Sequence, residues 1–215
     1  MARITALRFG KGRSKKANIA LDGRPAFSLE AEVAIKEGLK VGQELSTTQI
    51  EALKKASHRQ RCHDAAIRFL GYRPRSEQEV RQRLQQHGFD KGIIEAVIKD
   101  LKEHGLLDDA DFARFWKDNR QSFSPRSQWL TRLELKQKGV SGEIIDQVVS
   151  TIDDSDNAYR AAKSKTHSLT TSDYHNFRRR LGEYLKRRGF SYGVITKTIE
   201  RLWQEREALQ TSELP

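Results

Sequence analysis

One stretch of apolar and glycine residues occurs three times along the chain with identical internal spacing. Its glycines are Gly88, Gly139 and Gly189, which lie 51 and then 50 residues apart. A period of about 50 residues is typical of proteins built from tandem structural repeats. The three copies are Leu84, Gly88, Phe89, Ile93, Ile94, Val97, Ile98, Leu101; then Leu135, Gly139, Val140, Ile144, Ile145, Val148, Val149, Ile152; and finally Leu185, Gly189, Phe190, Val194, Ile195, Thr198, Ile199, Leu202.

Each copy predicts two helices joined at a glycine corner. The apolar positions after the glycine are spaced by one, three, one and three residues, which forms one stripe of an amphipathic helix. The glycine suits the position just after the preceding helix, where a left-handed backbone is favoured. Asp90, Ser141 and Ser191 follow as candidate N-caps of the next helix. We therefore expect the repeated residues to form cores, and the functional residues to lie elsewhere on the scaffold.

The composition favours small units in a row over one compact globule. Of the 215 residues, 36% are apolar and 32% are charged, and a repeat array leaves much surface exposed for such residues. The formal net charge of +11 favours an anionic partner. A single cysteine cannot form an internal disulfide, and no apolar run approaches the length of a membrane span. We expect a cytoplasmic protein with no membrane partner.

Residues 1–45 show the alternation of strands rather than the periodicity of helices. Alternation at Ile4–Phe9 and Ala17–Leu21 predicts two strands. The Asp22-Gly23 pair then predicts a tight turn into a third strand near Ala26–Leu29. The basic tip between the first two strands either contacts phosphate groups or is a solvated loop. Its cations are Lys11, Arg13, Lys15 and Lys16.

Capping signals divide the rest of the chain into helices. A short helix is expected near Glu30–Glu37, then one containing Ile50 and Leu53 and another through Ala65–Leu70, which ends before Pro74. The expected N-terminal signals are capping boxes at Ser46 and Ser76, an N-cap at Asp108, Ser124 with Pro125, and acidic residues from Asp153.

The predicted fold is mainly α, an elongated array of three tandem three-helix repeats with a small N-terminal cap of three strands. The expected limits are 1–45 for the cap, 46–107 for repeat 1 with a lead-in helix, 108–152 for repeat 2 and 153–208 for repeat 3. Residues 209–215 are expected to form a frayed tail. A polar stretch at 165–172 predicts a linker that lets the third repeat shift against the second.

No residue pattern predicts catalysis, a cofactor or a metal centre. No Walker sequence is present, and the histidines are scattered without a nucleophile beside them. Cys62 near His58 and His63 offers a metal pair but lacks a second cluster. The Asp108, Asp109 and Asp111 carboxylates are better explained by helix capping than by acid–base chemistry.

Lys and Arg residues recur at corresponding places in the three repeats, and we predict that they bind the partner. The middle helix of every repeat carries Lys or Arg while its apolar face is committed to packing, which would produce a basic stripe. The alternative is that these are separate solvated faces. The candidates from the repeats are Arg73, Arg75, Arg81, Arg83, Lys117, Arg120, Arg126, Arg132, Lys136, Lys138, Arg178, Arg179, Arg180, Lys186, Arg187 and Arg188.

An ordered series of short motifs resembles the signature of the RecX family. The resemblance covers residues 60–152 well and extends less specifically to the third repeat and the N-terminal strands. Each motif alone is weak, whereas the ordered set is specific. The motifs are Arg73-Pro74-Arg75-Ser76 with Glu79 and Leu84, Gly88-Phe89, Leu101, Gly105-Leu106-Leu107-Asp108-Asp109, Phe112-Ala113, Ser124-Pro125-Arg126, Leu133-Glu134-Leu135 and Lys138-Gly139-Val140.

The resemblance implies a non-enzymatic regulator of the RecA recombinase in homologous recombination, DNA repair and the SOS response. Such a protein lies in the groove of the RecA filament on single-stranded DNA and inhibits ATP hydrolysis and strand exchange. We expect it to act as a monomer. The family transfers no catalytic residues and no defined contact residues, so the candidate binding residues rest on charge alone.

Two other classes remain open from the residues. Helix–corner–helix units with basic surfaces also describe helix-turn-helix DNA-binding proteins, although the helix from Lys91 to His104 is nearly balanced in charge. An RNA-binding helical repeat is a third class, but no base-reading pattern is present. A repeat array predicts that single repeats bind far more weakly than the whole chain, and cations predict a steep loss of binding with salt.

Overall fold

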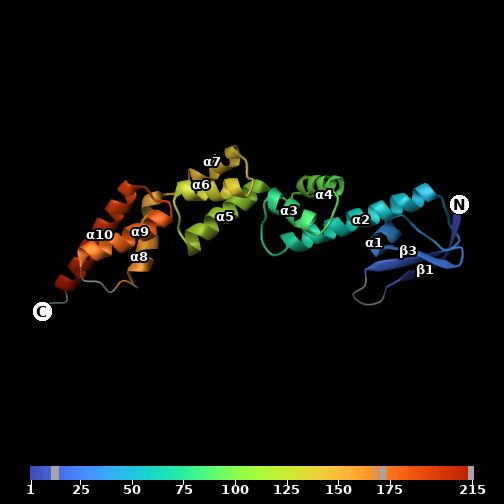
Figure 1. Ribbon diagram of the computed structural model, residues 1–215, viewed down its shortest axis with the longest axis horizontal. Helices are drawn as coiled ribbons and strands as arrows, with labels where there is room; N and C mark the ends of the chain where they lie inside the picture. Colours follow the sequence, from blue (N-terminus) through green and yellow to red (C-terminus); the bar gives the residue numbers. More distant parts are fainter. Residues whose placement is uncertain (11–14, 168, 170–172, 213–215) are drawn as a thin grey trace. The chain divides into compact units, whose positions relative to one another are not determined.

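The computed structural model describes residues 1–10, 15–167, 169 and 173–212, and Figure 1 shows its elements in chain order. The chain divides into two compact units. Unit 1 contains Met1–Arg73 and Val80–Leu106, and unit 2 contains Pro74–Glu79 and Leu107–Pro215. The predicted fold class is confirmed, because a small antiparallel sheet is followed by a long series of helices.

The sheet of unit 1 has four strands where three were predicted. β1 (Ala2–Phe9), β2 (Lys16–Leu21), β3 (Arg24–Glu30) and β4 (Glu44–Leu45) form the order β3-β2-β1-β4, with antiparallel pairing. The predicted turn is confirmed, since Asp22 and Gly23 have φ values of 49° and 80°, as a two-residue hairpin requires. β4 escaped prediction because two residues are too short to show alternation.

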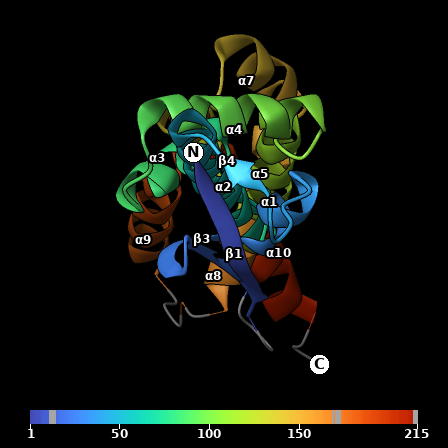
Figure 2. The same cartoon turned by 90° about the vertical axis from the view of Figure 1, so that its right-hand side faces the viewer.

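The helices of unit 1 begin with α1 (Ala31–Lys36), which packs with β3 against α2 (Thr47–Leu70), as Figure 2 also shows. The capping box between Ser46 and Gln49 is confirmed. The prediction of two helices before Pro74 is wrong, because α2 is continuous over 24 residues. No Gly or Pro interrupts that stretch of the sequence.

The rest of unit 1 packs around the second half of α2. α4 (Lys91–Glu103) contacts α2, while α3 (Glu77–Gln86) crosses the division between the two units. Two cores result from this arrangement. Ile4, Ile19 and Leu53 are buried between the sheet and α2, and Val97 and Leu101 are buried in α4.

Unit 2 contains two three-helix groups, each with its own core. The first group is α5 (Asp109–Phe123), α6 (Gln128–Gln137) and α7 (Gly142–Val149). The second is α8 (Asp154–Thr166), α9 (Tyr174–Arg187) and α10 (Tyr192–Ser212). Hereafter the first repeat means α2–α4, the second α5–α7 and the third α8–α10. The limits of the repeats as folding domains stay a prediction.

The repeated sequence positions occupy the cores as expected. Of the 24, 22 are buried or half-buried, including Thr198, the polar member of the set, and the two exposed ones are the corner glycines Gly88 and Gly139. The corner glycines Gly88, Gly139 and Gly189 have φ values of 77°, 80° and 82°, so the predicted left-handed position after each helix is confirmed.

Most predicted helix starts are correct in position, with two differences in detail. The Asp108 and Asp153 carboxylates accept hydrogen bonds from the first turns of α5 and α8, and Ser76 Oγ accepts one from the Glu79 N–H. Asp90 and Ser141 are N-caps, but their side chains make no capping hydrogen bond in the described structure.

The predicted start at Ser124-Pro125 is wrong, because α6 begins after Ser127. The Ser127 hydroxyl accepts a hydrogen bond from the Leu130 N–H at 3.1 Å. The proline holds Ser124 in an extended conformation, with φ −156° and ψ 70°, which excludes a helix there.

The expected tail and linker lie partly outside the described residues. The last helix, α10, continues to Ser212, and residues 213–215 of the expected tail lie outside the described residues. α8 extends to Thr166, and residues 168 and 170–172 of the expected linker also lie outside them.

The same joint between successive repeats occurs twice within unit 2. The Asp109 carboxylate accepts a hydrogen bond from the Glu77 N–H at 2.8 Å, and Asp154 accepts one from the Gln128 N–H at 2.7 Å. In each case the first helix of one repeat satisfies the first N–H of the preceding middle helix, which otherwise has no intrahelical partner. Burial raises the pKa of Asp154, and the Gln128 N–H partly offsets that effect.

At each joint, the corner glycine of the following repeat packs closely against the start of the preceding middle helix. A Cβ at Gly189 would lie 2.6 Å from Ser127 Oγ and 2.8 Å from Leu130 Cβ, whereas no described atom lies within 4 Å of that position at Gly88. Gly88→Ala is therefore expected to cost about 1 kcal/mol for the left-handed backbone, and Gly189→Ala at least about 2 kcal/mol because overpacking is added. Urea unfolding measures both changes, and equal losses would contradict the joint.

Candidate partner-binding surface

The structure divides the predicted binding cations into two groups. Some interact with other residues of the protein, and the others are exposed. Lys11 and Arg13 lie outside the described residues. Lys15 and Lys16 are exposed where β2 begins. The remaining sixteen belong to the repeats, and their partners decide which of them can face another molecule.

Arg120 and Arg126 both interact with a largely buried carboxylate, that of Glu134 in α6. Glu134 has a side chain that is 11% exposed, and it accepts hydrogen bonds from Trp116 Nε1 at 2.7 Å and Arg120 Nε at 2.9 Å. Arg126 forms an ion pair with the same carboxylate. Burial lowers the pKa of Arg120 and of Arg126, and for Arg126 the nearby Arg120 and Arg188 charges lower it further. Arg120 thus links α5 to α6, and Arg126 links the loop between these helices to the same carboxylate of α6.

Two more of the candidates, Lys138 and Arg188, lie at the joints, and a third, Lys117, makes its contact within the second repeat. Lys138 Nζ donates to Glu79 Oε1 at 2.7 Å and lies 5.4 Å from the centre of the Trp116 ring. Arg188 stacks over Tyr184 at 4.2 Å, and its backbone carbonyl accepts a hydrogen bond from the Ser127 N–H. Lys117 donates to Thr151 Oγ1 at 3.3 Å. Their main role is therefore structural.

Another pair of candidates links the two helices at a corner. Arg81 of α3 forms an ion pair with Glu95 of α4, and Arg132 of α6 forms one with Asp146 of α7. Arg73 and Arg75 are half-buried and also interact within the protein. The predicted stripe of equivalent cations is thus interrupted in the first two repeats. Among the described candidates on α3 and α6, only Arg83 and Lys136 are exposed and have no carboxylate partner.

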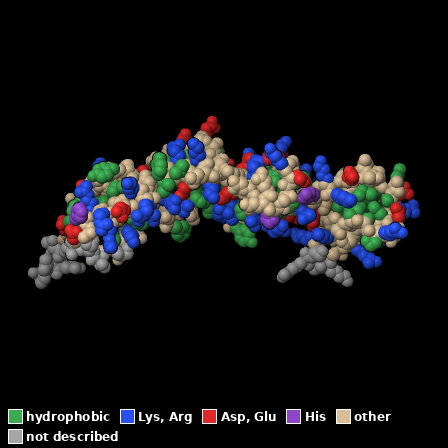
Figure 3. All heavy atoms as spheres, in the orientation of Figure 1, with side chains coloured by type: hydrophobic (Ala, Val, Ile, Leu, Met, Phe, Trp, Pro, Cys, Tyr) green, Lys and Arg blue, Asp and Glu red, His purple; other side chains and the backbone are tan. Residues whose placement is uncertain are grey.

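α9 of the third repeat is different. Its five cations are exposed, and in the part of the chain that the structure describes none of them pairs with a carboxylate. The sequence of α9 contains one acidic residue, Glu183. Figure 3 shows Lys and Arg side chains on the surface of the third repeat, with side chains of other kinds between them. The five residues, named the α9 cation surface, are Arg178, Arg179, Arg180, Lys186 and Arg187.

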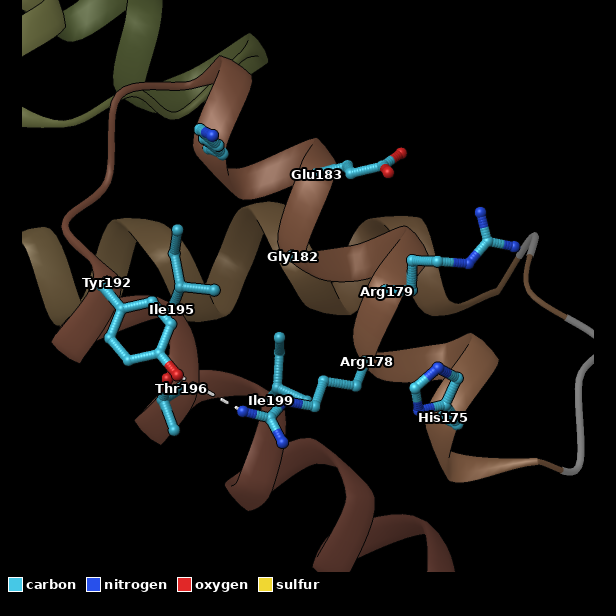
Figure 4. A pocket seen from close by; sticks show the side chains of 10 residues that line it. His175, Arg178, Arg179, Gly182, Glu183, Tyr192, Ile195, Thr196 and Ile199 are labelled. Atoms are coloured by element: carbon cyan, nitrogen blue, oxygen red, sulfur yellow. Dashed lines mark hydrogen bonds between the residues drawn. The ribbon is translucent and has the colours of Figure 1, made fainter.

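A groove of about 520 Å³ runs between α9 and α10 beside this surface. Gly182, Ile195 and Ile199 line it, and Figure 4 shows Arg178, Arg179 and Tyr192 around it. Arg178 donates a hydrogen bond to the Tyr192 hydroxyl at 3.4 Å, and Arg179 donates one to Asn176 Oδ1 at 3.2 Å. The third repeat therefore combines uncommitted positive charge with an apolar recess.

No pattern in the sequence predicts that Arg120 and Arg126 both pair with Glu134. These contacts join residues 14 positions or fewer apart through a tertiary packing that periodicity does not encode. A signal for the corner ion pairs was present. Arg81 and Arg132 precede their glycine by seven residues, and Glu95 and Asp146 follow it by seven.

The residues considered above as possible metal ligands, Cys62 and His58, are packed within the protein. Cys62 is fully buried, and burial raises the pKa of its thiol to about 11. His58 packs against the Phe89 ring at 5.3 Å. Among the described residues, no group of three His, Cys, Asp or Glu side chains is arranged to hold a metal ion. The described helices also include none with the length and apolar character needed to cross a bilayer.

Comparison with known proteins identifies the family. Residues 62–101 match the family model of the first three-helix domain of RecX, and residues 108–149 match that of the second. A regulatory protein RecX from Clostridium botulinum is 32% identical over 93% of this chain and 96% of its own length. The chain belongs to the RecX family. Another RecX regulatory protein, from Bacillus velezensis, is 29% identical over 95% of this chain and 79% of its own length.

Solved RecX structures have the same fold. A crystal structure of regulatory protein RecX superposes with a TM-score of 0.72 at 23% identity, covering 93% of this chain and 100% of that one. RecX from Lactobacillus salivarius gives a TM-score of 0.59 at 22% identity, covering 68% of this chain and 97% of its own. The RecX domain matches cover residues of α2–α4 and of α5–α7, the first two repeats.

Proposed function

We propose that this RecX protein regulates the RecA recombinase by binding RecA filaments on single-stranded DNA. Binding inhibits ATP hydrolysis and strand exchange by the filament. The protein acts as a cytoplasmic monomer. It regulates the filament by binding to it, and it catalyses no reaction of its own. Membership of a family of regulatory proteins supports this role.

The observation that carries the proposal is the uncommitted charge of α9 on a repeated scaffold. The α9 cation surface has no carboxylate partner within the described residues, although it lies on a chain where Glu134, Glu79, Glu95 and Asp146 bind other cations. A filament of identical subunits on DNA offers repeated anionic groups. Several modest contacts on one chain then combine through their effective concentration.

The experiment adds the purified protein to RecA filaments preformed on circular single-stranded DNA and follows ATP hydrolysis. The expected result is suppression at protein concentrations well below that of RecA, because one bound molecule acts on a filament of many subunits. A plain DNA-binding protein would suppress hydrolysis only near saturation of the DNA, by competing for bare strand. Suppression that required saturating protein would therefore support the helix-turn-helix alternative and overturn the proposal.

A further inference from the structure

The third repeat lacks the ion pair that closes the corner of the other two. Counted from the corner glycine, Arg81 and Arg132 occupy the position seven residues before it, and Glu95 and Asp146 the position seven residues after it. The corresponding residues around Gly189 are Gly182 and Thr196. Both of them line the groove between α9 and α10. The groove lies where a long arginine side chain and a carboxylate join the two helices in the first and second repeats.

The absence of a side chain at Gly182 opens the groove onto an aliphatic floor. A Cβ added there would lie 3.8 Å from Ile199 Cδ1 and 4.0 Å from Ile195 Cγ2, which are ordinary contact distances. Gly182 has a helical conformation without positive φ, so the turn itself does not require glycine. A glycine in a helix interior costs about 1 kcal/mol relative to alanine. The effect of a glycine at position 182 is therefore to leave the groove open.

Charge and shape together select the occupant. Arg178, Arg179 and Lys186 stand around the recess, with Glu183 as the one carboxylate among the lining residues, and this rim favours carboxylates. The floor of Ile195 and Ile199 fits a branched aliphatic side chain, whereas a tyrosine ring, Tyr192, also lines the groove and its hydroxyl accepts a hydrogen bond from Arg178. The floor itself is aliphatic and therefore favours an aliphatic side chain over a stacked base. We propose that the α9–α10 groove binds an acidic peptide segment of a protein partner, with one aliphatic side chain of that segment inserted against the two isoleucines.

The first test uses the full chain and a fluorescently labelled synthetic peptide of alternating Asp and Glu with one central Leu. Fluorescence anisotropy is expected to show saturable binding. A control peptide with Ser in place of Leu is expected to bind at least about tenfold more weakly, because the leucine side chain no longer leaves water. Equal binding of the two peptides would overturn the insertion of an aliphatic side chain.

The second test closes the groove with the ion pair of the other repeats. The double substitution Gly182→Arg with Thr196→Glu leaves the net charge unchanged and is expected to lower peptide affinity at least about tenfold. Circular dichroism and urea unfolding check that the variant is folded. If it does not fold, the exposed rim provides the test, because Arg179→Gln is expected to weaken binding while the matched Lys197→Gln, an exposed cation of α10 outside the groove, leaves it unchanged.

The outcomes that overturn the inference are distinct from failure of the proposed function. Unchanged peptide affinity in the folded double variant, or equal effects of Arg179→Gln and Lys197→Gln, would place the peptide elsewhere. Binding of a labelled oligothymidylate that is lost in the double variant, without peptide binding, would assign the groove to nucleic acid. Because no recombinase is present in these assays, none of these results bears on inhibition of RecA filaments.

Discussion

Glu134→Ala is expected to destabilise unit 2 by about 3 kcal/mol, because removing the carboxylate of a largely buried ionic cluster leaves the two arginine charges uncompensated. Arg120 and Arg126 would then face each other with their shared carboxylate gone, and Trp116 Nε1 would lose its acceptor. Urea unfolding followed by tryptophan fluorescence measures the loss, and Trp116 lies in the cluster itself.

The matched control is Asp146→Ala, which also removes a carboxylate that pairs with an arginine. The Asp146 side chain is 64% exposed and its partner Arg132 is 47% exposed. An exposed pair contributes at most about 1 kcal/mol, so this variant is expected to change stability little. If both variants lost the same free energy, the cluster around Glu134 would not have the structural role assigned to it.

Neutralising the α9 cation surface is expected to weaken inhibition of the RecA filament strongly while leaving the fold intact. In the variant with Arg178→Gln, Arg179→Gln and Arg180→Gln, three exposed charges without carboxylate partners in the described structure are removed. If each contributes about 0.7 kcal/mol to binding, the concentration for half-inhibition of ATP hydrolysis rises about 30-fold. The same inhibition assay on preformed filaments measures the change.

A second triple variant separates local contact from overall charge. Lys36→Gln, Lys40→Gln and Lys55→Gln remove the same number of exposed cations from unit 1. These residues are not among the predicted contacts, so half-inhibition is expected to shift less than about threefold. Equal shifts in the two triple variants would mean that net charge alone attracts the protein to the filament.

The sequence predicted the parts of the fold that depend on local pattern. The spacing of apolar residues after Gly88, Gly139 and Gly189 located the cores, because a helix places residues three and four apart on one face. The acidic and hydroxyl residues located most helix starts by satisfying free N–H groups. Errors arose where the local signal was short or misleading, as at the two-residue strand β4 and at Ser124-Pro125.

The sequence could not separate structural cations from exposed ones. Arg126 and Arg179 could not be distinguished in the sequence, since both are cations near the start of a middle helix. Only packing shows that Arg126 contacts Glu134, whereas Arg179 is exposed. The groove was detectable in principle. Aligning the repeats on their glycines shows Gly182 and Thr196 in place of a charge pair, although only the structure shows that the charged residues meet.

Lysine footprinting tests most directly whether the third repeat contacts the filament. The protein is acetylated briefly with and without RecA filaments on single-stranded DNA, and mass spectrometry compares the modification of each lysine. The account predicts that filaments slow acetylation of Lys186, on the α9 cation surface, at least about tenfold, while Lys36 and Lys55 react at unchanged rates. Protection of Lys36 and Lys55 with unchanged reactivity at Lys186 would contradict it.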